Sequence, residues 1–177
     1  GLYLSGKGVQ PDAQEAVKWI KAAAEKGVPA AQFNLGSLYL EGRIVPLDYK
    51  AAMTWLLKAA AQNLPEAQLN IASMYFDGEG VPQDYAEAGK WLKLAAANGN
   101  AAAQLALGRM YAHGQGVEKN ALRAFMWGEI AAEKSAMSES EKKTIREMAE
   151  KALTPEELKE ARAMMQKCKD SQLRDCF

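Results

Sequence analysis

Apolar and polar positions recur along the chain with a step of 36 residues. Shifting the sequence by that step aligns four tyrosines, then every tryptophan, then the small-residue runs that follow each tryptophan. The aligned tryptophans are Trp19, Trp55, Trp91 and Trp127. Such a period is typical of an array whose units bury their apolar faces only by stacking on neighbours. We therefore expect the function to lie on the surface of the array.

Within each period, the apolar spacing predicts two helices joined by a turn. In one unit, Ala31, Leu35, Leu38 and Tyr39 form the stripe of the first helix, and Gly36 leaves room for close approach of a neighbour. Second helices are expected over residues 12–26, 48–62, 84–98 and 120–134. Because each of them carries one of the aligned tryptophans, we expect the four indoles to be buried in the core.

The turns between the helices share a pattern that ends in Asp or Asn. They run over residues 42–48, 78–84 and 114–120. Their glycines permit positive φ, their valine closes the helix pair, and the final Asp48, Asp84 or Asn120 is a good N-cap for the second helix. The repeating unit is therefore predicted to be a helix hairpin.

The period fails after Ala136. Two capping boxes, Ser138–Glu141 and Thr154–Glu157, predict further helices to about Leu153 and Lys167. Apolar positions of these helices are expected to cover the last unit: Ile145, Met148, Ala149, Ala152, Leu158, Ala161, Met164 and Met165. The predicted organisation is a solenoid over 1–136, made of a partial repeat 1–28 and full repeats 29–64, 65–100 and 101–136, followed by capping helices and a tail over 137–177.

The N-terminal end of the array has no such cap. Leu2, Tyr3 and the Trp19 helix are expected to be exposed there and to favour self-association. Because the chain opens at Gly1 inside a repeat, we expect further sequence ahead of it.

Composition excludes several classes of function. Lys and Arg total 22 and so do Asp and Glu, so there is no net charge of the kind that nucleic-acid binding requires. No apolar run is long enough to span a bilayer. His113 is the only histidine, which removes multi-histidine metal sites and triads that need a histidine base. We expect no catalytic residue, no metal and no cofactor.

The two cysteines, Cys168 and Cys176, lie eight residues apart near the end of the chain. A disulfide there would clip the tail to the preceding helix and would suit an oxidising compartment such as the bacterial periplasm. Two free thiols in a cytoplasmic protein are the alternative.

The recurring pattern AxAxxxLGxxYxxGxGVxxDxxKAxxWxxKAAxxG resembles the Sel-one-like repeat (SLR), a relative of the tetratricopeptide repeat (TPR). Residues 30–64, 66–99 and 102–135 match it, and 1–27 match its later part, with Ile44 in place of a turn Gly and Asn120 in place of Asp. The resemblance implies an all-α, right-handed superhelix of antiparallel helix pairs that scaffolds protein complexes. The ending, with its second cysteine, is similar to exported bacterial members, which favours the periplasm or secretion over the cytoplasm.

By analogy with tetratricopeptide arrays, the first helices line a concave face that binds a peptide or protein segment. The expected contact residues are Phe33, Ser37, Leu40, Leu69, Ser73, Phe76, Asp77, Leu105, Arg109 and His113, with Glu41 and Ala112 beside them. The sequence therefore predicts a non-enzymatic scaffold or adaptor of the bacterial envelope. The alternative is a penicillin-binding or β-lactamase-like enzyme, as assigned to cysteine-rich relatives, although those carry a disulfide inside each repeat and these repeats contain no cysteine.

Overall fold

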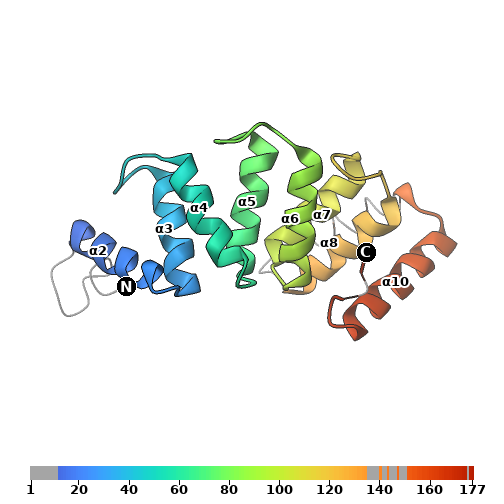
Figure 1. The fold of residues 1–177 in the computed structure, drawn as a ribbon. Coiled ribbons are helices and arrows are strands. Elements are labelled where there is room, and N and C mark those ends of the chain that lie inside the picture. The colour runs from blue at the N-terminus through green and yellow to red at the C-terminus, as the bar shows by residue number, and fades with distance from the viewer. Residues whose placement is uncertain (1–11, 135–139, 141–142, 144–146, 148–150, 175) are drawn as a thin grey trace. The chain divides into compact units, whose positions relative to one another are not determined.

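The chain folds into α-helices connected by short turns (Figure 1). The computed structural model describes residues 12–134, 140, 143, 147, 151–174 and 176–177. In these residues the helices are α2 (Ala13–Glu25), α3 (Pro29–Glu41), α4 (Tyr49–Ala60), α5 (Pro65–Asp77), α6 (Tyr85–Ala97), α7 (Ala101–His113), α8 (Ala121–Lys134) and α10 (Pro155–Asp170). The predicted all-α class is confirmed.

The helix boundaries follow from capping residues that recur with the period. The carboxylates of Asp12, Asp48 and Asp84 accept backbone N–H groups at the starts of α2, α4 and α6. In each turn, the N–H of the capping residue also donates to the carbonyl of the aligned tyrosine nine positions earlier. The three bonds are Asp48 to Tyr39 at 3.1 Å, Asp84 to Tyr75 at 2.8 Å and Asn120 to Tyr111 at 2.9 Å.

The helices form two compact units, Gly1–Ile71 and Ala72–Phe177, with the boundary inside α5. In the first unit, α3 packs against both α2 and α4. Its Gly36 is essential to this contact, because a Cβ built there would lie 2.8 Å from Cγ of Leu56 and 3.2 Å from the carbonyl oxygen of Ala52. The predicted role of Gly36 in close helix approach is confirmed.

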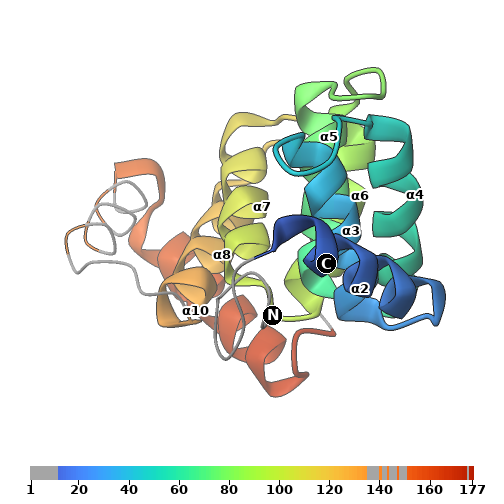
Figure 2. The same ribbon diagram turned by 90° about the vertical axis from the view of Figure 1, so that its left-hand side faces the viewer.

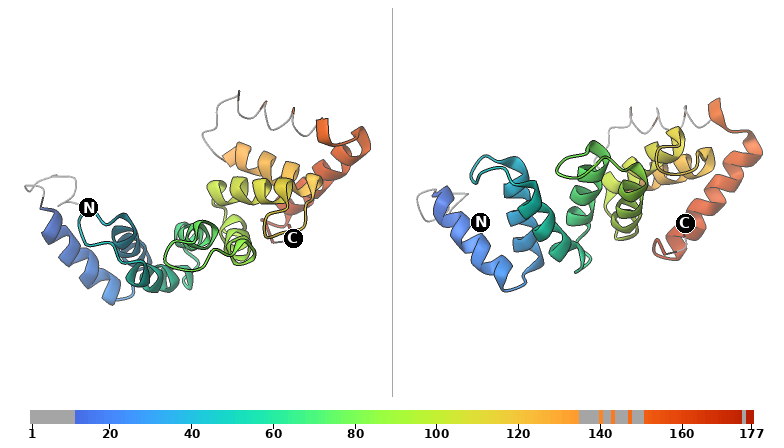
Figure 3. Two further views of the ribbon diagram at one scale, coloured as in Figure 1. Left: turned by 90° about the horizontal axis from the view of Figure 1, so that it is seen from above. Right: turned by 45° about the horizontal axis from the view of Figure 1, so that its top comes forward.

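In the second unit, α7 packs against α6 and α8, and α10 packs against α8. Figures 2 and 3 show α7, in yellow-green, alongside α8, in orange. Gly108 of α7 faces α8 closely, since a Cβ there would lie 3.2 Å from the carbonyl oxygen of Ala124. Gly116, in the turn after α7, lies against the start of α6, where a Cβ would clash with the carbonyl of Tyr85.

The prediction that all four aligned tryptophans are buried is wrong. Trp127 is fully buried, but Trp19 is 60% exposed, in keeping with the expected exposure of its helix, and Trp55 and Trp91 are partly exposed. The position that is buried is the next one, occupied by Leu56 and Leu92. It follows the tryptophan by about 100° around the helix and faces the core, which leaves the indole at the margin of the helix pair.

The cap of α10 agrees with its sequence pattern. The Thr154 N–H donates to the Glu157 carboxylate at 2.7 Å, and the Glu157 N–H donates to the Thr154 hydroxyl at 3.3 Å. Ala161 is buried with Leu153 and with Phe125 of α8, so this helix does cover α8 as expected.

The remaining predictions for the capping region have mixed outcomes. Leu158, Met164 and Met165 are partly buried, whereas Ala152 is exposed. The Ser138–Glu141 box, Ile145, Met148, Ala149, Leu2 and Tyr3 lie at least in part outside the described residues. The division at residue 136 stays a prediction.

Within the described residues, no helix has both the length and the apolar character that crossing a membrane requires. The same part of the chain contains no group of three or more His, Cys, Asp or Glu side chains arranged to hold a metal ion.

Candidate functional site

Each of the helices α3, α5 and α7, which we call the first helices of their repeats, has one buried and one open face. In α3 the buried positions are Ala31, Gln32, Leu35 and Gly36. The predicted contact residues Phe33, Ser37 and Leu40 are spaced by four and three residues and form a partly exposed stripe outside that core. The stripe is therefore less buried than the opposite face of this helix.

The predicted residues of α5 show the same division. Ala67, Gln68, Ile71 and Ala72 are buried, while Leu69 and Phe76 are partly exposed and Ser73 and Asp77 are exposed. The Phe76 ring meets the ring of Tyr85 edge-on, with centroids 4.9 Å apart. Phe76 therefore stabilises the turn region of its own unit as well as lying on the open face.

In α7 the open face carries a guanidinium. Leu105 and Ala112 are partly exposed, and Arg109 and His113 are exposed, whereas Leu107, Gly108, Met110 and Tyr111 are buried. His113 is the last residue of the helix, where a basic side chain faces unpaired carbonyls. This face therefore places the partly exposed Leu105 one helical turn before the Arg109 guanidinium.

A hydrogen bond connects Ser37, one of the predicted contact residues, with Asn70 of α5. The Asn70 amide donates to the Ser37 hydroxyl at 3.3 Å, which links α5 to α3 within the first unit. Asn34, at the equivalent position of α3, is exposed. The structure thus brings Phe33, Ser37, Leu40 and Leu69 into the first unit, and Ser73, Phe76, Asp77, Leu105, Arg109 and His113 into the second.

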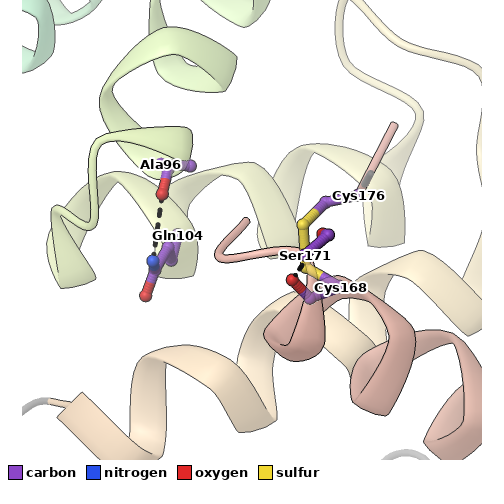
Figure 4. The surroundings of a disulfide bond; sticks show 5 residues. All are labelled: Ala96, Gln104, Cys168, Ser171 and Cys176. Atoms are coloured by element: carbon purple, nitrogen blue, oxygen red, sulfur yellow. Dashed lines mark hydrogen bonds between the residues drawn. A yellow bond between two sulfur atoms is a disulfide. The ribbon is translucent and has the colours of Figure 1, made fainter. Parts of the chain in front are cut away.

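Sequence reasoning missed a buried glutamine at the start of each first helix. Each donates its amide N–H to a carbonyl in the last turn of the preceding helix. The bonds are Gln32 to Ala24 at 3.3 Å, Gln68 to Ala60 at 3.3 Å and Gln104 to Ala96 at 3.0 Å, the last drawn in Figure 4. The recurrence of Gln at the period of 36 was the available signal. Each of these carbonyls also accepts a backbone N–H, from Gly27, Asn63 and Gly99 at 2.9–3.0 Å. The glutamines therefore add a second donor at each helix end and are structural.

Charged groups with shifted pKa values lie near the starts of other helices. The pKa of Lys18 in α2 and that of Lys90 in α6 are raised because each ammonium donates to a carboxylate three residues earlier, Glu15 and Glu87. The pKa of Glu157 is lowered because its carboxylate accepts the N–H of Thr154. These shifts belong to helix capping and surface ion pairs.

The structure joins Cys168 to Cys176 by a disulfide, with Cα atoms 4.7 Å apart (Figure 4). Both residues are buried. The bond ties the end of α10 to the segment that follows it.

Comparison with known proteins agrees with this repeat architecture. The model of the Sel1 repeat family matches residues 1–28, 29–64, 65–100 and 101–135. No match was found among curated proteins.

Solved structures give the same result. A Sel1 repeat protein from Oxalobacter formigenes is 32% identical, with a TM-score of 0.73, over 90% of this chain and 72% of that one. The protein c5321, a protective antigen present in uropathogenic Escherichia coli strains, is 32% identical with a TM-score of 0.83, over 99% of this chain but only 37% of its own. The cysteine-rich protein B of Helicobacter pylori shares the fold at 21% identity and a TM-score of 0.58, over 74% of this chain and 92% of that one. The chain belongs to the Sel1 repeat family of helical repeat proteins.

Proposed function

We propose that this chain is a non-enzymatic adaptor of the bacterial envelope that binds a protein or peptide segment on the open faces of its first helices. Sel1 repeats are generally protein–protein interaction modules, and proteins built from them are typically non-catalytic scaffolds. The finer assignment rests on the open stripes of α3, α5 and α7.

The observation that carries the proposal is the burial pattern within each first helix. In α3, Ala31, Gln32, Leu35 and Gly36 are buried, while the two large apolar side chains of Phe33 and Leu40 are partly exposed. Leu69 and Leu105 occupy the position of Phe33 in α5 and α7 and are also partly exposed. Large apolar side chains at this spacing outside a core are suited to anchor a peptide.

Placement in the envelope is supported by the disulfide of the tail. Disulfides persist in oxidising compartments such as the periplasm and are rare in the bacterial cytoplasm. Cell fractionation with an antibody to the protein, followed by mass measurement before and after alkylation, tests this part. Recovery in the cytoplasmic fraction with both cysteines alkylated would contradict it.

The binding site is tested by selecting peptides from a random library on the immobilised wild-type protein and measuring their affinity by fluorescence anisotropy. For the first unit, the variant Phe33→Ser/Leu40→Ser is expected to weaken binding by about thirtyfold, the effect of losing about 2 kcal/mol at an anchor. Leu57→Ser is the matched control, since Leu57 is 42% exposed on α4, outside the proposed face.

For the second unit, the variant Leu105→Ser/Arg109→Glu is likewise expected to weaken peptide binding. Its control is Leu94→Ser, because Leu94 is 48% exposed and lies on α6, outside the proposed face. Thermal melting of every variant separates lost binding from lost folding. Equal affinity of the face variants and their controls would overturn the proposed site. Rapid hydrolysis of a chromogenic β-lactam by the purified wild-type protein would overturn the non-enzymatic assignment.

A further inference from the structure

The segment after α10 folds back onto the second unit and presents an aromatic ring to it. Phe177 stacks on Trp127 of α8, with centroids 5.4 Å apart and planes inclined by 27°. The Lys93 ammonium of α6 lies over the Phe177 ring, 5.9 Å from its centroid. Leu173 and Cys176 of the same segment are buried. We call Trp127 and Lys93 the aromatic-binding surface.

This segment reaches that surface through a turn that is unfavourable by itself. Gln172 and Leu173 have φ values of 53° and 69°, in the left-handed region that residues with a Cβ rarely adopt. The Cys168 carbonyl accepts hydrogen bonds from the Ser171 hydroxyl and from the Leu173 N–H, each at 2.9 Å. Together with the disulfide from Cys168 to Cys176, these bonds hold the tail in place.

The tryptophan in this contact differs in burial from its counterparts. Trp127 is fully buried, whereas Trp19, Trp55 and Trp91 at the equivalent positions are exposed or partly exposed. Its indole nitrogen has no hydrogen-bond partner among the described residues, so the ring is held by packing alone. Phe177 itself remains 46% exposed. Of the apolar side chains of the tail, Phe177 is therefore the exposed one, whereas Leu173 and Cys176 belong to the core.

We propose that the aromatic-binding surface is a second protein-binding site, which takes a phenylalanine side chain from a partner polypeptide and is occupied here by the tail of the chain itself. An indole face favours an offset-stacked aromatic ring, and an ammonium over that ring adds a cation–π attraction. The disulfide keeps the local concentration of the chain's own Phe177 high, so a partner must displace it. This site lies on α6 and α8 and does not rest on the first-helix faces.

The test uses this chain with the substitution Phe177→Ala, which removes the ring and leaves the disulfide intact. The probe is a fluorescein-labelled peptide copied from the tail, Gln-Leu-Arg-Asp-Ser-Phe, with serine in place of cysteine. The control peptide ends in alanine. We expect Phe177→Ala to bind the phenylalanine peptide at least about tenfold more tightly than the alanine peptide, and the wild-type protein to bind the phenylalanine peptide at least about tenfold more weakly than Phe177→Ala does.

Adding Lys93→Ala to Phe177→Ala should weaken the phenylalanine peptide several-fold, whereas adding Lys90→Ala, an exposed α6 residue outside the surface, should not. An independent readout is the exchange rate of the Trp127 indole proton, followed by NMR. It should rise in Phe177→Ala and fall again when the peptide is added. Equal binding by wild type and Phe177→Ala, no binding by either, or no discrimination between the two peptides would overturn the proposal.

Discussion

Replacing Gly116 by alanine should separate the turn after α7 from the start of α6. At φ 65°, a Cβ on this residue would clash with the Tyr85 carbonyl and lie 2.7 Å from the Ala86 nitrogen. Both neighbours are backbone atoms, so neither yields by a change of rotamer. The left-handed conformation alone costs a residue with a Cβ about 1–2 kcal/mol, and forced separation of packed backbone adds about 1–3 kcal/mol.

Gly114→Ala is the matched control for that substitution. Gly114 has φ 71°, almost the same backbone conformation, but its Cβ would meet mainly the Lys119 side chain at 3.3 Å. It therefore carries the conformational cost without the clash. For a chain of this size, 1 kcal/mol corresponds to about 2–4 °C in melting temperature. We expect a loss of about 2–8 °C for Gly114→Ala and of about 4–20 °C for Gly116→Ala, with the second at least about 2 °C larger.

Melting should be followed by circular dichroism and by tryptophan fluorescence, because a repeat array need not unfold in one step. A larger fluorescence change at low temperature in Gly116→Ala would place the disruption in the second unit, which contains the buried Trp127. Equal melting temperatures for the two variants would refute the reasoning, since they would show that the close approach to α6 does not matter.

Three further substitutions test the core and the caps. Trp127→Ala should lower the free energy of unfolding by about 3–5 kcal/mol in urea denaturation, whereas Trp19→Ala should change it by less than about 0.5 kcal/mol; similar losses would contradict the unequal burial of the column. Gln104→Leu removes one of two donors to the Ala96 carbonyl, which keeps the Gly99 N–H at 3.0 Å, and should cost about 0.5–1.5 kcal/mol, in contrast to Gln166→Leu on exposed α10; equal urea midpoints would argue against this role. The lowered pKa of Glu157 means that the folded state binds its proton less readily than the unfolded chain, so the stabilisation is present above the ordinary value of 4.5 and is lost as pH falls through the lower folded value. Urea midpoints between pH 7 and pH 3 should therefore fall more in wild type than in Glu157→Gln, which keeps the cap but does not titrate, and parallel curves would refute the assignment.

The repeat architecture was accessible from the sequence because its determinants are local. A capping Asp or Asn, a left-handed glycine and a tyrosine at fixed spacing specify each turn, and the same bond appears in the three turns that the structure describes, at Asp48, Asp84 and Asn120. The buried glutamines carry an equally regular signal. They were overlooked because a polar residue in an apolar stripe is usually assigned to the surface.

The burial of individual residues was less accessible. A column of identical residues suggested one environment, yet Trp19 and Trp127 differ because burial depends on what the next segment of chain supplies. The open faces could be predicted as positions left over from packing. The hydrogen bond between Asn70 and Ser37 could not be predicted, because it depends on the distance between α5 and α3 and not on the apolar pattern of either helix.

The tail lies beyond the reach of any periodic argument because it has no counterpart in the repeats. Its disulfide closes a loop between residues only eight apart, and the chain-entropy estimate for so short a loop is about 2.5 kcal/mol, less than for a cross-link between distant elements. A bond placed to stabilise the whole array would join distant helices. This one fixes the position of Leu173, Cys176 and Phe177 relative to α10, which in turn packs on α8. Its effect is therefore concentrated on whether Phe177 rests against Trp127, the contact that the proposed partner would have to displace.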